Sequence, residues 1–199
     1  MLKNFLNKDF IEAGCDEAGR GCLAGPVVAA AVILPPNFRL KELDDSKKLN
    51  EKTRNKLRPI IEEKALAYAV AFIEPEKIDE INILNASFLA MTNAVKALTI
   101  TPDQLLIDGN RFRTDLEIPY HCIIKGDGKF KSIAAASILA KTYRDEYMLK
   151  IHQEHPEYGW NQNMGYPTVK HRKAIEEFGI CDHHRKTFNH SPKQLTIDF

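Results

Sequence analysis

The sequence predicts an α/β domain in which helices cover a central sheet, followed by a small helical portion at about residues 156–190. Two observations predict this class. Short apolar runs of strand length, such as the β-branched and alanine-rich run over residues 26–34, alternate with longer segments that have helical periodicity. Glycines and prolines separate these segments, and the chain has no repeat, linker or low-complexity stretch. We therefore expect residues 1–190 to form one domain and residues 191–199 to form a C-terminal tail.

The first half of the chain contains three predicted strands and one predicted helix. The strands are residues 11–16, residues 26–34 and residues 66–73, and a glycine-rich turn separates the first two. The helix covers Glu51–Lys64, because Asn50 before it is a favourable N-cap whose side chain can accept from a free amide of the first turn.

The middle of the chain reads as helix and then strand. Pro75 is suited to open a short helix, and residues 82–98 follow as a longer one. Residues 102–108 and residues 120–124 are predicted strands, which brings the number of strands to five.

Two capped helices complete the prediction. We expect Ser132 to cap a long helix that runs to about His155, and the alanines at residues 134–136 allow this helix to pack closely on a sheet. Thr168 caps a last helix, which Gly179 ends.

The composition excludes several classes of protein. The 199 residues carry 28 Lys and Arg against 27 Asp and Glu, a net charge of +1, so the chain lacks the strongly basic character that advertises a nucleic-acid partner. Its longest apolar run, residues 27–34, is far shorter than a membrane span, and the N-terminus lacks a signal-peptide core. The four cysteines show neither CxxC nor zinc-ligand spacing, which favours reduced thiols. We expect a cytoplasmic monomer that does not contact a membrane.

Four acidic residues form a candidate metal site. Asp16 and Glu17 close the first predicted strand before a glycine turn, and Asp108 likewise closes a later strand. Asp127 lies just ahead of the long helix. Carboxylates at such strand ends can converge at one edge of an open sheet, where divalent cations such as Mg²⁺ or Mn²⁺ relieve their repulsion. Taken singly, each acid is better explained as a turn former or cap, so the hypothesis depends on their convergence.

Six sequence blocks occur in one order over nearly the whole chain. They are GCDEAGRGCLAGPVVAAAVIL from residue 14, DSKKL from residue 45, IDG from residue 107, KGD from residue 125 with SIAAASILAKTYRD from residue 132, MGYPT from residue 164 and HHRKTF from residue 183. Together these blocks resemble ribonuclease HII. The resemblance implies a ribonuclease H-like three-layer fold, with a central mixed five-stranded sheet flanked by helices.

The same resemblance implies a function and a set of site residues. The expected enzyme cuts the RNA strand of RNA–DNA hybrids and nicks duplex DNA 5′ of embedded ribonucleotides, which leaves 3′-hydroxyl and 5′-phosphate ends. Two divalent ions, Mn²⁺ or Mg²⁺, are expected on four carboxylates, those of Asp16, Glu17, Asp108 and Asp127. The 2′-hydroxyl beside the scissile bond, which only RNA carries, is expected to contact a turn made of Gly19, Arg20 and Gly21. Tyr166 matches the tyrosine that stacks on the deoxyribose after the RNA–DNA junction.

Charge is distributed unevenly along the chain. Residues 39–58 hold eight Lys and Arg against four Asp and Glu, and residues 170–193 hold six against three, whereas residues 62–85 hold two against six. Basic flanks of this kind suit contact with phosphates, and the candidates are Lys47, Lys48, Lys125, Lys141, Arg144, Lys170, Arg185 and Lys186. Of these, we expect Lys47 and Arg185 to bind substrate. For the histidines at positions 171, 183 and 184, proton transfer and structural roles both stay open.

The last six residues resemble the short peptide by which replication proteins bind a sliding clamp. The candidate contacts of this peptide are Gln194, Leu195, Ile197 and Phe199. A frayed or self-packed terminus explains the same residues, because motifs of six residues recur by chance.

Two other functions compete with the leading hypothesis. One is an enzyme of the ribonuclease HIII type that lacks its N-terminal domain; only 13 residues precede Gly14, so we expect no such domain here. The other is a non-catalytic nucleic-acid-binding module, in which the acids are merely solvated.

Overall fold

The computed structural model describes residues 2–43, 46 and 49–191 of the chain. It contains a five-stranded sheet with the strand order β3-β2-β1-β4-β5. The strands are β1 (Glu12–Ala18), β2 (Val27–Ile33), β3 (Ala67–Ile73), β4 (Gln104–Asp108) and β5 (Tyr120–Ile123). The β2 strand pairs antiparallel with β1 and β3, whereas β4 runs parallel to β1 and β5. The sheet is therefore mixed.

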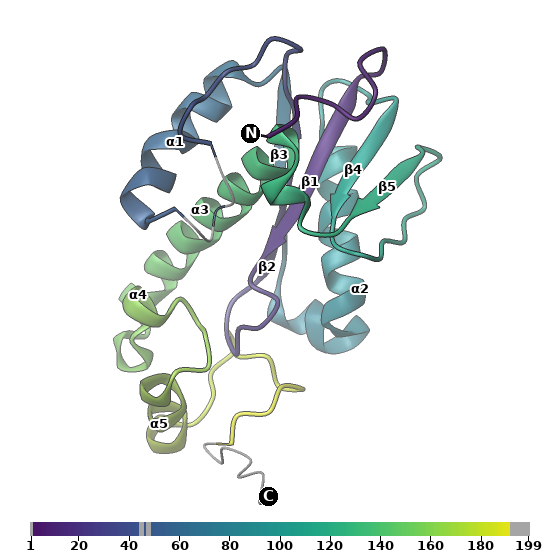
Figure 1. The fold of residues 1–199 in the computed structure, drawn as a ribbon. Coiled ribbons are helices and arrows are strands. Elements are labelled where there is room, and N and C mark those ends of the chain that lie inside the picture. The colour runs from purple at the N-terminus through teal and green to yellow at the C-terminus, as the bar shows by residue number, and fades with distance from the viewer. Residues whose placement is uncertain (1, 44–45, 47–48, 192–199) are drawn as a thin grey trace, which may run out of the picture.

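Helices cover both faces of this sheet (Figure 1). On one face lies α2 (Pro75–Lys96), and on the other lie α3 (Lys131–Glu154) and, beside it, α1 (Glu51–Lys64). A smaller helical portion follows and consists of η2 (Pro156–Tyr158), α4 (Trp160–Asn163) and α5 (Val169–Phe178). The predicted three-layer α/β fold with a helical C-terminal portion is confirmed. Within the described ranges, no helix combines the length and apolar character that crossing a membrane requires.

The central strands are buried on both faces. Alternate residues of β2 face opposite sides, with Ala29 and Ala31 in the core under α2, and Ala30 and Val32 in the core under α3. Close approach of α3 to β1 depends on Gly14, because a Cβ there would lie 2.3 Å from a backbone carbon of α3. This close approach places the middle of α3 directly behind the end of β1, where the acidic residues lie.

Most predicted helix ends are confirmed. The side chain of Asn50 accepts a hydrogen bond from the amide of Thr53 at 2.8 Å, and that of Thr168 accepts one from the amide of His171 at 3.2 Å. Gly179 follows α5 with a φ of 80°, a conformation that favours glycine.

Several predicted boundaries differ from those of the structure by one or two residues, and two of the differences have a clear structural cause. The β1 strand does not end at Asp16, because its pairing with β2 continues until Ala18 lies opposite Val28. The two helices predicted after residue 75 lie end to end as α2, with a kink at Asn82, whose φ is 66°. The Asn82 side chain accepts from the amides of the next turn, so it caps the second part of α2.

The prediction that Ser132 caps the long helix is wrong. The α3 helix begins at Lys131, and its N-cap position, Phe130, makes no side-chain capping bond. Instead, the amide of Lys131 donates to the carbonyl of Lys3 at 2.9 Å, and the amide of Lys3 donates to the carbonyl of Lys129 at 2.8 Å. The N-terminal segment thus supplies the acceptor that a capping side chain would otherwise provide.

Candidate active site

Three carboxylates converge where β1 and β4 end. Asp16 comes from β1, Asp108 from the neighbouring parallel strand β4, and Asp127 from the short helix η1 (Gly126–Gly128). One oxygen atom of each side chain lies within 4.8 Å of the others. Asp16 and Asp127 are buried, and Asp108 is partly exposed. The structure therefore brings together three of the four acids that the sequence selected.

A glycine allows η1 to approach β4 this closely. The amide of Gly126 donates a hydrogen bond to Oδ1 of Asp108 at 2.6 Å. A Cβ at Gly126 would lie 2.6 Å from Cδ1 of Ile133 and 3.3 Å from Oδ1 of Asp108. Any larger residue at position 126 would therefore push apart the segments that carry Asp108 and Asp127.

The pKa of Asp16 is strongly perturbed. Burial raises its pKa well above the ordinary value, and the negative charges of Glu17 and Asp108 raise it further. A hydrogen bond from Ser137 of α3 works in the opposite direction. Crowded carboxylates of this kind are stabilised by a divalent cation, and an all-oxygen donor set suits a hard one. The residues present therefore fit Mg²⁺ or Mn²⁺.

Glu17 occupies a different position from the other three acids. It lines the same depression, and its carboxylate forms an ion pair with Arg20 at 3.2 Å. It does not belong to the group of oxygens that lie within 4.8 Å of one another among the described residues. Arg20 therefore offsets part of the like-charge repulsion that the Asp16–Glu17 pair creates.

Asp16, Glu17 and Asp108 line a depression of about 320 Å³, and Asp127 lies beside it next to Asp16 and Asp108. Besides the carboxylates, its lining includes the predicted turn, two serines and two large side chains: Gly19, Arg20, Gly21, Ser46, Ser137, Lys141 and Tyr166. Lys141 lies at the mouth of this site and also forms an ion pair with Asp145 one turn along α3. The predicted substrate-contacting turn and Tyr166 thus share one depression with the acids.

Two arginines that we expected near phosphates are instead buried. Arg185 is 0% exposed and donates to the carbonyls of Gly19, Arg20 and Gly25 at 2.7 to 3.1 Å. Arg144 is equally buried and donates to three other backbone carbonyls, those of Ala24, Pro26 and Met164. The prediction that Arg185 binds substrate directly is wrong, because its guanidinium is buried and donates to the backbone carbonyls of the turn that it holds in place. The same reason excludes Arg144 as a phosphate contact.

Tyr166 lies on a loop between α4 and α5. Its side chain is 39% exposed, and its ring lies near Lys141 and Arg144. Burial of the phenol and its contact with Cys22 raise the pKa of Tyr166. The ring therefore presents one face to the depression while its hydroxyl end is held by the protein.

Sequence analysis missed a pair of serines behind the acids. The hydroxyls of Ser46 and Ser137 lie 2.7 Å apart, and Ser137 also hydrogen-bonds to Asp16. The available signal was a serine within an otherwise apolar run of α3, at a position that helical periodicity places against the sheet.

Several predicted contacts cannot be placed. Lys47 and Lys48 lie outside the described residues, and so do the clamp-binding candidates Gln194, Leu195, Ile197 and Phe199.

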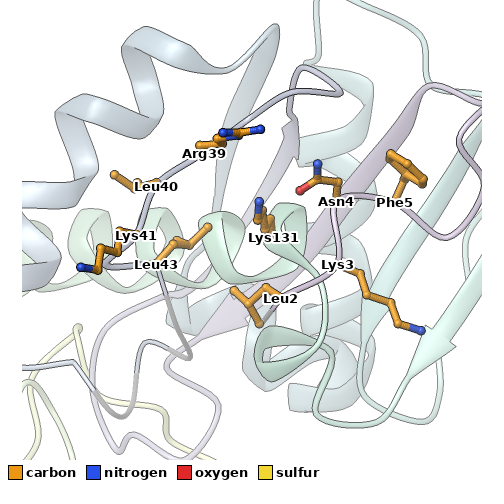
Figure 2. Close-up of a pocket in the computed structure, with 9 residues that line it drawn as sticks. All are labelled: Leu2, Lys3, Asn4, Phe5, Arg39, Leu40, Lys41, Leu43 and Lys131. Carbon is orange, nitrogen blue, oxygen red and sulfur yellow. The ribbon is translucent and has the colours of Figure 1, made fainter.

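A larger cavity of about 860 Å³ lies away from the acids, where the N-terminal segment meets the start of α3 (Figure 2). It combines apolar side chains with basic ones and is lined by Leu2, Lys3, Asn4, Phe5, Arg39, Leu40, Lys41, Leu43 and Lys131. It shares no lining residue with the acidic depression. Its size therefore does not make it the candidate active site.

Comparisons with known proteins show what the chain resembles in sequence and in fold. The sequence pattern of the family described as ribonuclease HII matches residues 13–191. A protein of Bacteroides thetaiotaomicron named ribonuclease HII is 64% identical over the full length of both chains. The crystal structure of ribonuclease H2 from Pyrococcus horikoshii superposes with a TM-score of 0.77 at 26% identity, covering 90% of this chain and 94% of that one. A second structure, from Archaeoglobus fulgidus, is described as a PCNA:RNase HII complex. One of its chains superposes with a TM-score of 0.73 at 24% identity, covering 93% of this chain and 98% of that one.

Proposed function

The chain belongs to the ribonuclease HII family and is therefore a divalent-metal-dependent endoribonuclease of the ribonuclease H type; from this premise we propose that the acidic depression is its catalytic centre. There it cuts the RNA strand of RNA–DNA hybrids and nicks duplex DNA 5′ of embedded ribonucleotides. The observation that carries the proposal is the approach of Asp16, Asp108 and Asp127 to within 4.8 Å at an open depression.

The three aspartates and Glu17 are the residues that would hold two divalent cations, Mg²⁺ or Mn²⁺. Bound cations would supply an activated water, shielding of the phosphate and stabilisation of the leaving oxygen. Burial of Asp16 and Asp127 keeps their oxygens aimed at one point, and Ser137 holds the carboxylate of Asp16 from behind. Glu17 is assigned as the fourth ligand because it lines the same depression as Asp16 and Asp108 and follows Asp16 in β1.

The chain's own residues are arranged to recognise the sugar beside the scissile bond. The turn at residues 19–21 presents backbone groups to the depression, and its glycines allow close approach to a 2′-hydroxyl, which DNA lacks. Buried Arg185 fixes this turn through the carbonyls of Gly19 and Arg20. Tyr166 lies in the same depression and is placed to pack on the neighbouring deoxyribose.

The family assignment also bears on the competing functions. A non-catalytic module gives no reason to bury Asp16 among other carboxylates, whereas bound divalent cations would relieve their repulsion. The matching family is ribonuclease HII, which removes the reason for preferring a ribonuclease HIII type enzyme.

Cleavage of a labelled duplex that contains one ribonucleotide tests this function. The Asp108→Asn variant should lose more than about 100-fold in kcat with either Mg²⁺ or Mn²⁺, because a metal ligand contributes several kcal/mol to the transition state. Asp115→Asn is the matched control, since Asp115 is an exposed aspartate that pairs with Lys96 outside the site. Full activity of Asp108→Asn would contradict the proposal.

The C-terminal tail is proposed to bind a sliding clamp. Support comes from the Gln194-to-Phe199 peptide and from the Archaeoglobus fulgidus relative, whose structure is described as a complex with PCNA. Deletion of residues 194–199 should abolish pulldown by the bacterial clamp and leave duplex cleavage unchanged. Pulldown by the truncated chain would exclude the tail as the binding element. We also propose that residues 1–190 form the single catalytic domain from which this tail extends.

A further inference from the structure

Two buried histidines lie behind the Tyr166 loop. His171 belongs to α5, His184 belongs to the segment that follows α5, and both side chains are 0% exposed. Their Nε2 atoms lie 3.3 Å apart. Neither histidine lines the acidic depression, so proton transfer to or from the substrate is not available to them in this arrangement.

The partners of His171 fix which of its nitrogens carries the proton. Its Nδ1 lies 3.0 Å from the carbonyl oxygen of Tyr166, which can only accept, so Nδ1 donates. The indole N–H of Trp160 points at Nε2 of His171 at 3.0 Å, and an indole nitrogen can only donate. Nε2 therefore accepts, and the ring of His171 is neutral.

The same reasoning applies to His184. The backbone amide of Cys181 donates to its Nδ1 at 3.1 Å, so that nitrogen accepts. The remaining proton is on Nε2 and points to Nε2 of His171. The result is a series of hydrogen bonds in one direction, from the Cys181 amide through His184 and His171 to the carbonyl of Tyr166.

This series ends on the Tyr166 backbone, whose amide also donates to the carbonyl of Asn163 at 2.8 Å. The carbonyl of Tyr166 also accepts from the amide of Thr168 at 2.8 Å. The preceding Gly165 has a φ of 79°, and its carbonyl accepts from the amide of Leu23, shortly after the substrate-contacting turn. A shift of the imidazole pair would therefore move the Tyr166 ring relative to that turn.

A charge on either ring would break the series. Protonated His171 would carry an N–H on Nε2, where the donors of Trp160 and His184 already point. Burial, above all, lowers the pKa of both rings, that of His184 to about 3. The titratable or charged groups that face the pair from neighbouring elements are Tyr158, Arg172, Cys181, His183 and His190. The pair thus stays neutral at physiological pH.

From this geometry we propose that the neutral His171–His184 pair is a positioning device: it fixes the Tyr166 backbone and thereby the selectivity for a ribonucleotide–deoxyribonucleotide junction. This inference rests on the proposed role of Tyr166 in contacting the deoxyribose. His171 and His184 act through Tyr166 and touch no substrate themselves.

Variants of His171 test the proposal through a ratio of activities. His171→Leu removes the three hydrogen bonds of the imidazole, to Tyr166, Trp160 and His184, so kcat/KM at a single embedded ribonucleotide should fall about tenfold more than on a long RNA–DNA hybrid. His171→Asn keeps an N–H near the position of Nδ1 and should restore most of the ratio. His155→Leu is the matched control, because His155 packs against Trp160 in the same cluster but makes no hydrogen bond to the Tyr166 loop among those described. Equal losses on both substrates would reduce His171 to a structural residue and overturn the proposal.

A spectroscopic measurement on the unmodified protein tests the proposal without requiring that the variants fold. Nitrogen-15 NMR of the imidazoles should show the Nδ1–H tautomer for His171 and the Nε2–H tautomer for His184, both neutral down to pH 5. Opposite tautomers, or titration near pH 6.5, would overturn the arrangement. Tyr166→Ala separates the two ideas: if it leaves the activity ratio unchanged, the junction-contacting role of Tyr166 fails, while the NMR result still decides the state of the pair.

Discussion

The guanidinium of Arg185 lies 2.7 Å from the carbonyl oxygen of Gly19, so a residue near the end of the chain holds the turn that follows the acidic strand. Burial lowers the pKa of Arg185 to about 10, and the side chain therefore keeps its charge at neutral pH. A buried charge of this kind is retained only because backbone carbonyls surround it. The turn and the C-terminal segment consequently form one structural unit, although about 160 residues separate them.

Arg185→Lys is expected to loosen this turn. A lysine ammonium keeps the charge but cannot reproduce the planar fork that reaches three carbonyls at once. The free energy of unfolding should fall by about 3 kcal/mol, and kcat/KM on a hybrid should fall about tenfold. Urea denaturation and initial-rate measurements give both values. Arg172→Lys is the control, because Arg172 donates to two exposed carbonyls; a similar loss in both variants would contradict the assignment.

Asp16→Asn should stabilise the metal-free protein while it abolishes cleavage. The folded-state pKa of Asp16 is raised, so the folded chain binds a proton that the unfolded chain releases above about pH 3.9. The stability of the metal-free wild type therefore decreases as pH rises through this interval, and Asn removes that dependence.

Thermal unfolding in EDTA at pH 5, 7 and 8 measures the effect of this substitution. The gain in Tm of Asp16→Asn over the wild type should increase with pH. Added Mn²⁺ should raise the Tm of the wild type and have a smaller effect on the variant. A variant that is less stable than the wild type at pH 8 in EDTA would contradict the electrostatic reading of the site.

Gly126→Ala and Gly128→Ala form a matched pair within η1. A Cβ at position 126 would contact Ile133 at 2.6 Å and Asp108 at 3.3 Å, whereas a Cβ at position 128 meets nothing within 4 Å. Gly126→Ala should therefore lose about 1 to 3 kcal/mol of stability and displace Asp108, a proposed metal ligand. Gly128→Ala should change the stability little and should leave Asp108 in place. Metal titration followed by activity measures both effects, and equal apparent metal affinities in the two variants would show that the contact at Gly126 is unimportant.

The sequence predicted the strands, the layers and the positions of the acids because these depend on local patterns. Apolar runs of strand length and the caps Asn50 and Thr168 carry their own signals. The extension of β1 to Ala18 was not predictable, because it depends on how far β2 continues to pair with it. Ser132 failed as a cap for a similar reason, since the acceptor comes from Lys3, about 130 residues away in sequence.

The predictions for basic residues show where sequence reasoning ends. Basic segments of a chain suit contact with phosphates, and this expectation placed Arg144 and Arg185 near the substrate. Both are buried because the segment after β1 turns several carbonyls toward one point, which no local pattern reveals. The histidine pair behind Tyr166 also requires the fold, because it joins α5 to the segment that follows it.

The contribution of His184 to stability should fall on mild acidification, because its ring is neutral in the fold. Its pKa is lowered to about 3, whereas an unfolded histidine titrates near pH 6.5. Between these values the unfolded chain binds a proton that the folded chain does not. The contribution of His184 to the free energy of unfolding therefore rises with pH across this window, and this contribution is lost as pH falls. The pKa of His171 is lowered for the same main reason, burial, and acts in the same direction.

Urea unfolding of the wild type and His184→Gln at pH 7, 6 and 5 isolates this contribution, since Asp16 and the other acids are common to both chains. One histidine contributes a slope of at most about 1.4 kcal/mol per pH unit. The slope of His184→Gln should be shallower than that of the wild type by a large part of this amount between pH 6 and pH 5. Parallel curves for the wild type and His184→Gln would mean that His184 is protonated in the folded protein, and its Nδ1 could then not accept from the amide of Cys181.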